Sequence, residues 1–360
     1  MLSSPCYNFT MQADRGSSDL SAIGPVSLIG GSGFIGSRVA ALLNEKKIPF
    51  RIGDQKPSDS FPDSWNACDV RDPESLRAHL SDVNAIVNLA AEHRDDVRPI
   101  SRYYETNVEG ASKLCQAARD TGISRIIFTS SVAVYGFNPR PVAEDGPFQP
   151  FNDYGKTKLE AESVYKAWAQ EDPARSLVIV RPTVVFGEGN RGNVYNLVRQ
   201  IASGKFFMVG SGKNVKSMAY VGNLAEFLIH MLSLGPGIHI FNYVDGPDFD
   251  TNTLVEHVTR CLGKPASANF RIPKSLALAG GYMVDGIARV SGRTFPVSAI
   301  RIRKFCESTQ FRADRVLETG FRPPYSLEEA LARTIAHEFS ANGSKHGGAQ
   351  ATPNALRSRY

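Results

Sequence analysis

Cysteine is scarce in this 360-residue chain, and the spacing of the few present excludes several kinds of site. The cysteines are five in number and include no CxxC pair: Cys6, Cys68, Cys115, Cys261 and Cys306. An odd, unpaired set argues against a zinc site or a disulfide framework and for reduced thiols in a cytosolic compartment. We therefore expect no metal ion and a cytoplasmic location.

Clustered positive charge is also lacking. The chain has 41 Lys and Arg residues against 36 Asp and Glu, and the net charge of +5 is spread along the sequence. Because no basic block is interleaved with aromatic residues, nucleic acid is not an expected partner, whereas a phosphorylated small molecule is compatible with this charge. The hydrophobic content of 42% and the charged content of 21% are typical of a soluble globular protein.

Long apolar runs are the third absence. The candidate at 272–284 is too short to span a bilayer and is soon followed by Asp285 and Arg289. We expect a buried helix there, with peripheral membrane contact as the alternative. Residues 1–24 lack the apolar core of a signal peptide, so we expect a flexible extension, and the small, polar residues 341–360 are expected to form a disordered tail.

A glycine-rich turn is the first motif that is present. An apolar run at 26–29 leads into Gly30, Gly33 and Gly36, and an apolar-periodic helix follows. Glycines at such a turn allow the backbone to approach a pyrophosphate and the helix to lie close to the strand. The amino end of the helix then presents unpaired N–H groups to the anion. The pattern indicates a dinucleotide site.

The second strand, at 50–53, ends at Asp54, 18 positions after the last of these glycines. An acidic side chain there is placed to accept hydrogen bonds from an adenosine ribose, and its charge repels a 2′-phosphate. NAD is therefore favoured over NADP, although Lys56 or Arg38 leaves a 2′-phosphate open.

Strands and helices alternate through the first half of the chain. The β-like runs at 85–91 and 125–131 flank a predicted helix at 103–121. This alternation predicts an α/β fold, a Rossmann-type doubly wound parallel sheet, with binding groups at the carboxyl ends of the strands. We expect residues 25–185 to form the NAD-binding domain, which some later segments rejoin, and residues 186–340 to form mainly a smaller C-terminal substrate-binding lobe.

A tyrosine and a lysine stand four residues apart at Tyr154 and Lys158, near the start of a helix predicted to run to about residue 170. Residues at this spacing share one helix face. An ammonium beside a phenol favours the phenolate, so we expect Lys158 to lower the pKa of Tyr154 toward the range of a general base. Such a pair is common by chance, and its meaning depends on the other motifs.

The motifs together resemble the extended short-chain dehydrogenase/reductase family, in its nucleotide-sugar epimerase/dehydratase branch. The likeness runs from about residue 25 to residue 339 and keeps the family's motif order. It is carried by these residues: Gly30, Gly33, Gly36, Asp54, Asp69-Val70, Asn88-Leu89-Ala90-Ala91, Asn107, the run from Ser130 to Gly136, Tyr154, Lys158 and Arg181-Pro182.

The resemblance implies roles for the matched residues. Tyr154 would be the catalytic acid and base, Lys158 would bind the nicotinamide ribose, and Ser131 would hydrogen-bond the reacting hydroxyl of the sugar. The implied cofactor contacts are Gly30, Gly33, Phe34, Ile35, Gly36, Asp54, Asp69, Val70, Leu89, Ala90, Ala91, Asn107, Ser130, Tyr154, Lys158 and Pro182. Where the dehydratase branch carries Thr-Asp-Glu, this chain has Ser131-Val132-Ala133, which disfavours a dehydratase.

The second half of the sequence offers substrate contacts. The resemblance implies that Asn193 contacts phosphates, with a helix N-cap as the alternative, and that Lys216 stands where relatives carry a diphosphate-binding arginine. Arg301 and Arg303 lie near a second such arginine. The stretch 205–221 predicts a β-hairpin around a glycine turn, and 327–339 predicts a closing amphipathic helix.

These features predict an NAD-dependent enzyme that epimerises a nucleotide-diphosphate sugar at C4 through a 4-keto intermediate. A 4-keto-sugar reductase using NAD(P)H is the main alternative, because it needs the same residues. A non-catalytic dinucleotide-binding protein and a hydroxysteroid-type dehydrogenase are weaker options. The resemblance also leads us to expect a homodimer.

Overall fold

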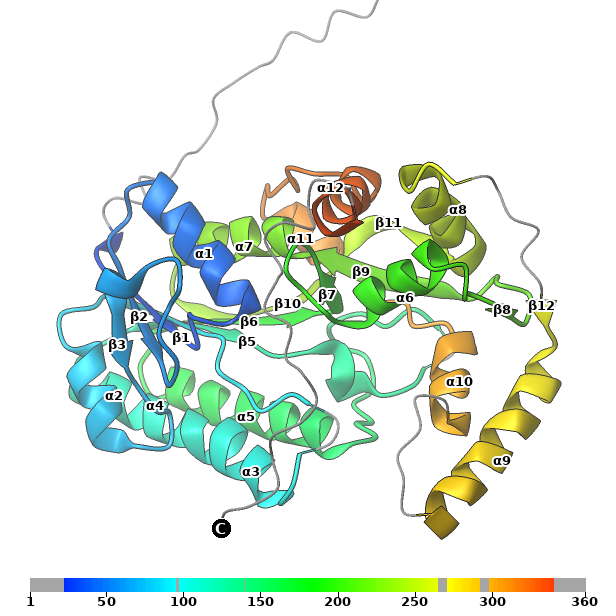
Figure 1. Ribbon diagram of the computed structural model, residues 1–360. Coiled ribbons are helices and arrows are strands. Elements are labelled where there is room, and N and C mark those ends of the chain that lie inside the picture. The colour runs from blue at the N-terminus through cyan, green and yellow to red at the C-terminus, as the bar shows by residue number, and fades with distance from the viewer. Residues whose placement is uncertain (1–22, 95–96, 139, 265–270, 292–297, 340–360) are drawn as a thin grey trace, which may run out of the picture.

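A seven-stranded parallel sheet forms the centre of the computed structural model, which describes residues 23–94, 97–138, 140–264, 271–291 and 298–339 (Figure 1). The strand order is β10-β6-β5-β4-β1-β2-β3. The strands are β1 (Val26–Ile29), β2 (Phe50–Asp54), β3 (Trp65–Ala67), β4 (Ala85–Asn88), β5 (Arg125–Thr129), β6 (Ser176–Pro182) and β10 (Gly237–Tyr243). The order reverses between β1 and β4, and this reversal opens a crevice beyond their carboxyl ends. The predicted Rossmann-type fold is confirmed.

Helices cover both faces of this sheet (Figure 1). One face carries α1 (Phe34–Glu45) and α7 (Val221–His230), which lie against each other. The other face carries α2 (Pro73–Leu80), α4 (Gly110–Asp120) and α5 (Asp153–Gln170). Because both faces are covered, the strands read as continuous apolar runs, and β1, β4 and β6 are buried at every position.

The helix predicted at 103–121 contains one irregular turn. It begins as α3 (Ser101–Tyr104), passes through a π-helical turn at Glu105–Glu109 and continues as α4. Such turns are frequent at functional sites. The helix that carries Tyr154 begins after Asn152, whose side chain accepts a hydrogen bond from the Gly155 N–H at 2.9 Å, and ends at Gln170 as predicted.

The later part of the chain adds smaller sheets and more helices. Strands β7 (Val184–Phe186), β9 (Val215–Tyr220) and β11 (Asp245–Asp250) form one sheet, and β8 (Met208–Val209) pairs with β12 (Arg271–Ile272). The helices around them are α6 (Asn193–Ala202), α8 (Thr251–Cys261), α11 (Asp314–Glu318) and α12 (Leu327–Phe339). Helix α12 has the predicted bounds.

The hairpin predicted at 205–221 is wrong. Gly210 and Gly212 do redirect the chain at positive φ, but β8 pairs with β12 and β9 pairs with β11 and β7. A glycine turn shows where the chain bends and does not fix which strands then pair, because distant segments compete for the same edges.

The apolar stretch at 272–284 is the second correction. It forms most of α9 (Lys274–Ser291), which stands beside α10 (Ala299–Cys306) at the lower right of Figure 1. The helix is not buried, since Leu276 is 64% and Met283 68% exposed. Among the described residues, no helix is long and apolar enough to cross a membrane. Residues 1–22 of the expected extension and the expected tail at 341–360 lie outside the described residues.

Candidate active site

The glycine turn forms a seat in which side chains would not fit. Gly30 has φ +75°, and a Cβ there would come within 2.6 Å of the Ala90 backbone nitrogen. A Cβ on Gly36 would come within 2.5 Å of the Gly31 Cα. No side chain caps the N–H groups of α1, whose N-cap is Gly33. The residues Phe34 and Ile35 form the first turn of this helix. This cradle fits the pyrophosphate of a dinucleotide.

The Asp54 carboxylate is fixed beside this seat. Its Oδ2 accepts a hydrogen bond from the Ser32 N–H at 3.1 Å, and its Oδ1 accepts one from the Lys56 N–H at 3.1 Å. Arg38, which the sequence left open as a phosphate ligand, instead donates to the Glu188 carbonyl oxygen at 3.1 Å. A carboxylate at the tip of β2 and an engaged arginine both favour a ribose without a 2′-phosphate.

Replacing Asp54 with alanine should therefore weaken NAD binding. The loss of charge-assisted hydrogen bonds to the ribose predicts an increase in Kd of roughly ten- to a hundredfold. Binding of NADP should be unchanged or tighter, because the repulsive charge is gone. Calorimetric titration with both dinucleotides measures this, and Asp59→Ala, at an exposed position in the following loop, is the matched control. Unchanged NAD affinity would remove Asp54 from the site.

Two of the implied cofactor contacts, Asp69 and Val70, lie after β3. Asp69 accepts hydrogen bonds from the Arg71 guanidinium, at 3.0 Å from Nε and 2.7 Å from Nη2. These hydrogen bonds hold the pKa of Asp69 below its usual range. Val70 is buried against Gly110, where a Cβ would come within 3.0 Å of it. The chain after β3 is thus held in place at the carboxyl edge of the sheet.

A buried asparagine fixes the loop after β4, which holds Leu89, Ala90 and Ala91. Asn107, from the π-helical turn, accepts from the Glu92 N–H at 2.8 Å and donates to the Glu92 carbonyl oxygen at 3.0 Å. It also donates to the Thr157 hydroxyl on α5 at 3.0 Å. Asn107 therefore positions the cofactor-facing loop relative to the helix that carries Tyr154. Sequence reasoning had no signal for Thr157.

The three predicted catalytic residues meet at the end of β5. Ser131 follows this strand, accepts a hydrogen bond from the Ala133 N–H at 3.1 Å and hydrogen-bonds the Tyr154 side chain. Lys158 lies one turn further along α5, with its Nζ 4.3 Å from the centroid of the Phe128 ring of β5. Both side chains of the pair therefore face the same strand, as their spacing predicts.

The expected direction of the Tyr154 pKa is wrong in this structure. Burial raises the pKa of Tyr154 and outweighs the opposing hydrogen bond from Ser131. Burial also lowers the pKa of Lys158 to about 7, against a smaller opposing effect of Glu162. Removal from water disfavours the phenolate and the ammonium alike. The sequence predicted the shared face of the two groups but not how deeply they lie.

A buried ion pair supports this site, and sequence reasoning missed it. Arg181 donates to the Glu162 carboxylate at 2.7 Å and 2.6 Å, and both side chains are fully buried. The Ser130 hydroxyl donates to Glu162 at 2.7 Å. The side chain of Ser130, an implied cofactor contact, therefore points at the ion pair. Glu162 is four residues after Lys158 on the same helix face, which is the signal that could have found it. Pro182 follows Arg181 and ends β6.

The predicted substrate contacts are more dispersed. Asn193 is the first residue of α6 and is exposed, and since the N-cap is Gly192, the N-cap alternative is wrong. Arg301 and Arg303 are exposed on α10.

Lys216 is engaged elsewhere in the structure. Its Nζ donates to the Lys304 carbonyl oxygen at 2.8 Å and also to the Glu307 carbonyl oxygen. Burial lowers the pKa of Lys216 to about 8. Lys216 thus holds the carboxyl end of α10, and this use of its ammonium was not predicted.

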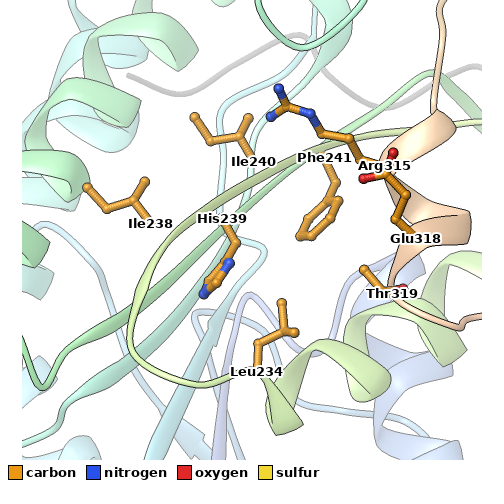
Figure 2. Close-up of a pocket in the computed structure, with 8 residues that line it drawn as sticks. All are labelled: Leu234, Ile238, His239, Ile240, Phe241, Arg315, Glu318 and Thr319. Atoms are coloured by element: carbon orange, nitrogen blue, oxygen red, sulfur yellow. The ribbon is translucent and has the colours of Figure 1, made fainter.

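A hollow of about 370 Å³ lies away from these residues, beside β10 (Figure 2). It is lined by Leu234, Ile238, His239, Ile240, Phe241, Arg315, Glu318 and Thr319. The hollow runs along the outer edge strand, on the far side of β6 from β5. Ligands of open parallel sheets bind beyond the carboxyl ends of the strands at the point where the order reverses, so this hollow is not the candidate site.

Comparisons with known proteins agree with this geometry. Residues 26–243 match the model of the NAD dependent epimerase/dehydratase family. The chain is 47% identical over 318 residues to the N-acetyl-alpha-D-glucosaminyl-diphospho-ditrans,octacis-undecaprenol 4-epimerase of Escherichia coli O157:H7, which covers 87% of this chain and 95% of that protein. It is 26% identical to the UDP-glucose 4-epimerase of Vibrio cholerae, over 88% of this chain and 96% of that one.

Solved structures share the fold. The UDP-N-acetylglucosamine 4-epimerase of Bacillus cereus superposes with a TM-score of 0.69 at 18% identity, over 86% of this chain and 97% of that one. At this level of identity the likeness concerns the arrangement of strands and helices. The sequence matches, in contrast, extend through the residues around the glycine seat and Tyr154.

Proposed function

The chain belongs to the NAD dependent epimerase/dehydratase family, and we propose that it inverts C4 of an N-acetylhexosamine carried on a polyprenyl diphosphate. It is an NAD-dependent C4 epimerase. The substrate proposal is carried by the 47% identity, over nearly the whole of both chains, to a 4-epimerase named for N-acetylglucosaminyl-diphospho-undecaprenol. The homodimer and the cytoplasmic location stay predictions.

Two side chains carry the proton chemistry in this proposal. Tyr154 acts as the phenolate, a form that burial disfavours in the free protein and that the positive charge of bound NAD would favour. It removes the proton of the 4-hydroxyl group and later returns it, and Ser131 orients that hydroxyl through the hydrogen bond it shares with Tyr154. Bound NAD supplies hydride transfer at C4 in both directions, so no net oxidation results. Lys158, on the same face, would hold the nicotinamide ribose. Glu162 and Arg181 hold helix α5 against the end of β5 and against β6, through the hydrogen bond from Ser130 and the buried ion pair.

The turn after Ser131 bears on whether the site could remove water from a sugar. Val132 and Ala133 begin a short 3₁₀ turn, Val132–Tyr135, in which no residue is acidic. Loss of water from a sugar needs an acid and a base at the reacting carbons, and this turn offers neither. A dehydratase is therefore disfavoured.

A nucleotide sugar is the second candidate substrate. The match to the UDP-glucose 4-epimerase of Vibrio cholerae, at 26% identity over 332 residues, favours it. Both candidates present a sugar on a diphosphate, and they differ in the group attached to the second phosphate, which is a polyprenyl chain in one and a nucleoside in the other.

Turnover of two substrates separates these candidates. The purified protein is incubated, without added cofactor, with N-acetylglucosamine on a polyprenyl diphosphate and with UDP-N-acetylglucosamine, and the released sugars are identified by chromatography. We expect kcat/KM for the lipid-linked sugar to exceed that for the nucleotide sugar by about a hundredfold or more. Equal or faster turnover of the nucleotide sugar would overturn the substrate proposal. No turnover of either sugar, together with one reduced dinucleotide consumed for each 4-keto sugar supplied, would instead support the 4-keto-sugar reductase.

A further inference from the structure

Helices α9 and α10 form a pair that stands out from the body of the protein (Figure 1). They approach closely at Gly281, where a Cβ would come within 2.8 Å of the Ala299 Cα. The Asp285 carboxylate accepts a hydrogen bond from the Ala299 N–H at 3.1 Å and so joins the amino end of α10 to α9. One face of α9 is thereby occupied by its neighbour.

The opposite face of α9 is apolar and exposed. Leu276, Ala279, Met283, Gly286 and Ile287 recur at helical spacing on it, and none carries charge. The exposed side chains on the two helices are large, with Met283 at 68%, Tyr282 at 67%, Leu276 at 64%, and Ile287 and Ile300 at 52% each. We call the three of them that share this face, Leu276, Met283 and Ile287, the apolar surface. An exposed cluster of this kind marks an interaction site more often than an ordinary surface.

The two helices carry more basic than acidic residues, of which Lys274 is paired with Glu307 at 3.4 Å. Within α9 and α10 the charged residues are Lys274, Arg289, Arg301, Arg303 and Lys304 against a single acid, Asp285. That acid already accepts the hydrogen bond from Ala299. An apolar face together with positive charge complements the headgroup region of an anionic bilayer, in which apolar side chains enter the acyl boundary and cations contact phosphates.

The helix pair also adjoins the active site. The Lys304 ammonium lies 4.9 Å from the centroid of the Phe151 ring, three residues before Tyr154. Lys216, in β9, holds the other end of α10 through the Lys304 carbonyl oxygen. These contacts join the helix pair, through α10, to the segment that leads into the helix carrying Tyr154.

We propose that the apolar surface of α9 docks the enzyme on an anionic phospholipid bilayer, and that the basic residues of α9 and α10 support this docking. The inference rests on the proposed lipid-linked substrate, since a long polyprenyl chain stays in the bilayer while its diphosphate and sugar reach the water. Docking needs no spanning segment, and apolar burial together with basic residues supplies the affinity.

Sedimentation with vesicles tests the docking directly. The full chain is mixed with vesicles of phosphatidylcholine alone or with phosphatidylglycerol, and the bound fraction is measured. We expect binding to the anionic vesicles that weakens as salt increases. Leu276→Glu with Met283→Glu should reduce binding about tenfold or more, because two apolar side chains are replaced by charges that the lipid repels. Leu317→Glu, at a 53% exposed position on α11, is the matched control and should bind as the wild type does.

Activity assays separate failure of docking from failure of the proposed substrate. The double variant should lose turnover of the polyprenyl substrate in vesicles and keep turnover of a water-soluble short-chain analogue, while its unchanged melting temperature shows that it folds. If the variant binds vesicles as the wild type does, docking is overturned even where lipid-linked sugars are converted. If the wild type binds vesicles but converts no lipid-linked sugar, docking stands and the substrate proposal fails. If the substitutions alter only the oligomeric state, the surface is a contact between copies and docking is overturned.

Discussion

Replacing Tyr154 with phenylalanine should reduce kcat for C4 epimerisation by about a thousandfold or more. The variant keeps the ring and loses the hydroxyl that hydrogen-bonds Ser131 at the end of β5. Without it, no positioned group removes the proton of the 4-hydroxyl. NAD binding should persist, because Gly30 and Asp54 would hold the pyrophosphate and the adenosine ribose, and neither group is altered by the substitution. Steady-state kinetics and calorimetric titration with NAD measure the two effects separately.

The control for this prediction removes a phenolic hydroxyl elsewhere. Tyr195, on α6, stacks on Phe339 with ring centroids 5.3 Å apart, and Tyr195→Phe should keep wild-type turnover. The kcat of Ser131→Ala should lie between those of Tyr154→Phe and Tyr195→Phe, because this variant loses one hydrogen bond to the phenol and keeps the phenol itself. Undiminished turnover by Tyr154→Phe would exclude the phenol from the reaction.

Replacing Arg181 with methionine should destabilise the fold more than any surface change. Glu162, fully buried, would keep only the partly exposed Lys166 at 3.4 Å, and breaking a buried ion pair from one side costs about 3–5 kcal/mol. The same guanidinium donates to the Glu144 carbonyl oxygen at 2.9 Å, which would also lose its donor. Tm should fall by roughly 10 °C, measured by circular dichroism on heating.

An exposed pair provides the comparison. Arg119 contacts Glu171 at the surface, and Arg119→Met should leave Tm nearly unchanged because water solvates the remaining carboxylate. The double change Arg181→Met with Glu162→Met should recover part of the loss, since no charge is then buried alone. A single Arg181→Met variant as stable as Arg119→Met would show that the ion pair does not hold β6 to α5.

The parts of the fold that the sequence predicts are those set by local patterns. Glycine spacing and apolar periodicity predict the turn at Gly30, the end of β2 at Asp54 and the extent of α5 and α12, because each depends on neighbours within a few turns. The hairpin at 205–221 could not be predicted correctly, since β8 pairs with β12 some 60 residues later. Likewise, the apolar run at 272–284 predicted a buried helix, and α9 is exposed because a run of apolar residues does not show whether other elements cover it.

The same division holds in the active site. The spacing of Tyr154 and Lys158 predicts that they share a face of α5, and in the structure Tyr154 contacts Ser131, just after β5, while Lys158 lies over Phe128 of β5. Their pKa directions result from burial by distant elements and could not be inferred from spacing. Lys216 shows the same limit, because the carbonyl oxygens that accept from it lie 88 and 91 residues away in sequence.

The central claim is that hydride leaves C4 of the sugar and returns to the same carbon while Tyr154 handles the proton. A substrate labelled with deuterium at C4, incubated in ordinary water without added cofactor, tests it most directly by mass spectrometry of the product. We predict an inverted sugar that retains deuterium at C4, with no reduced dinucleotide consumed. Deuterium lost to water, or one reduced dinucleotide consumed for each product formed, would contradict the account.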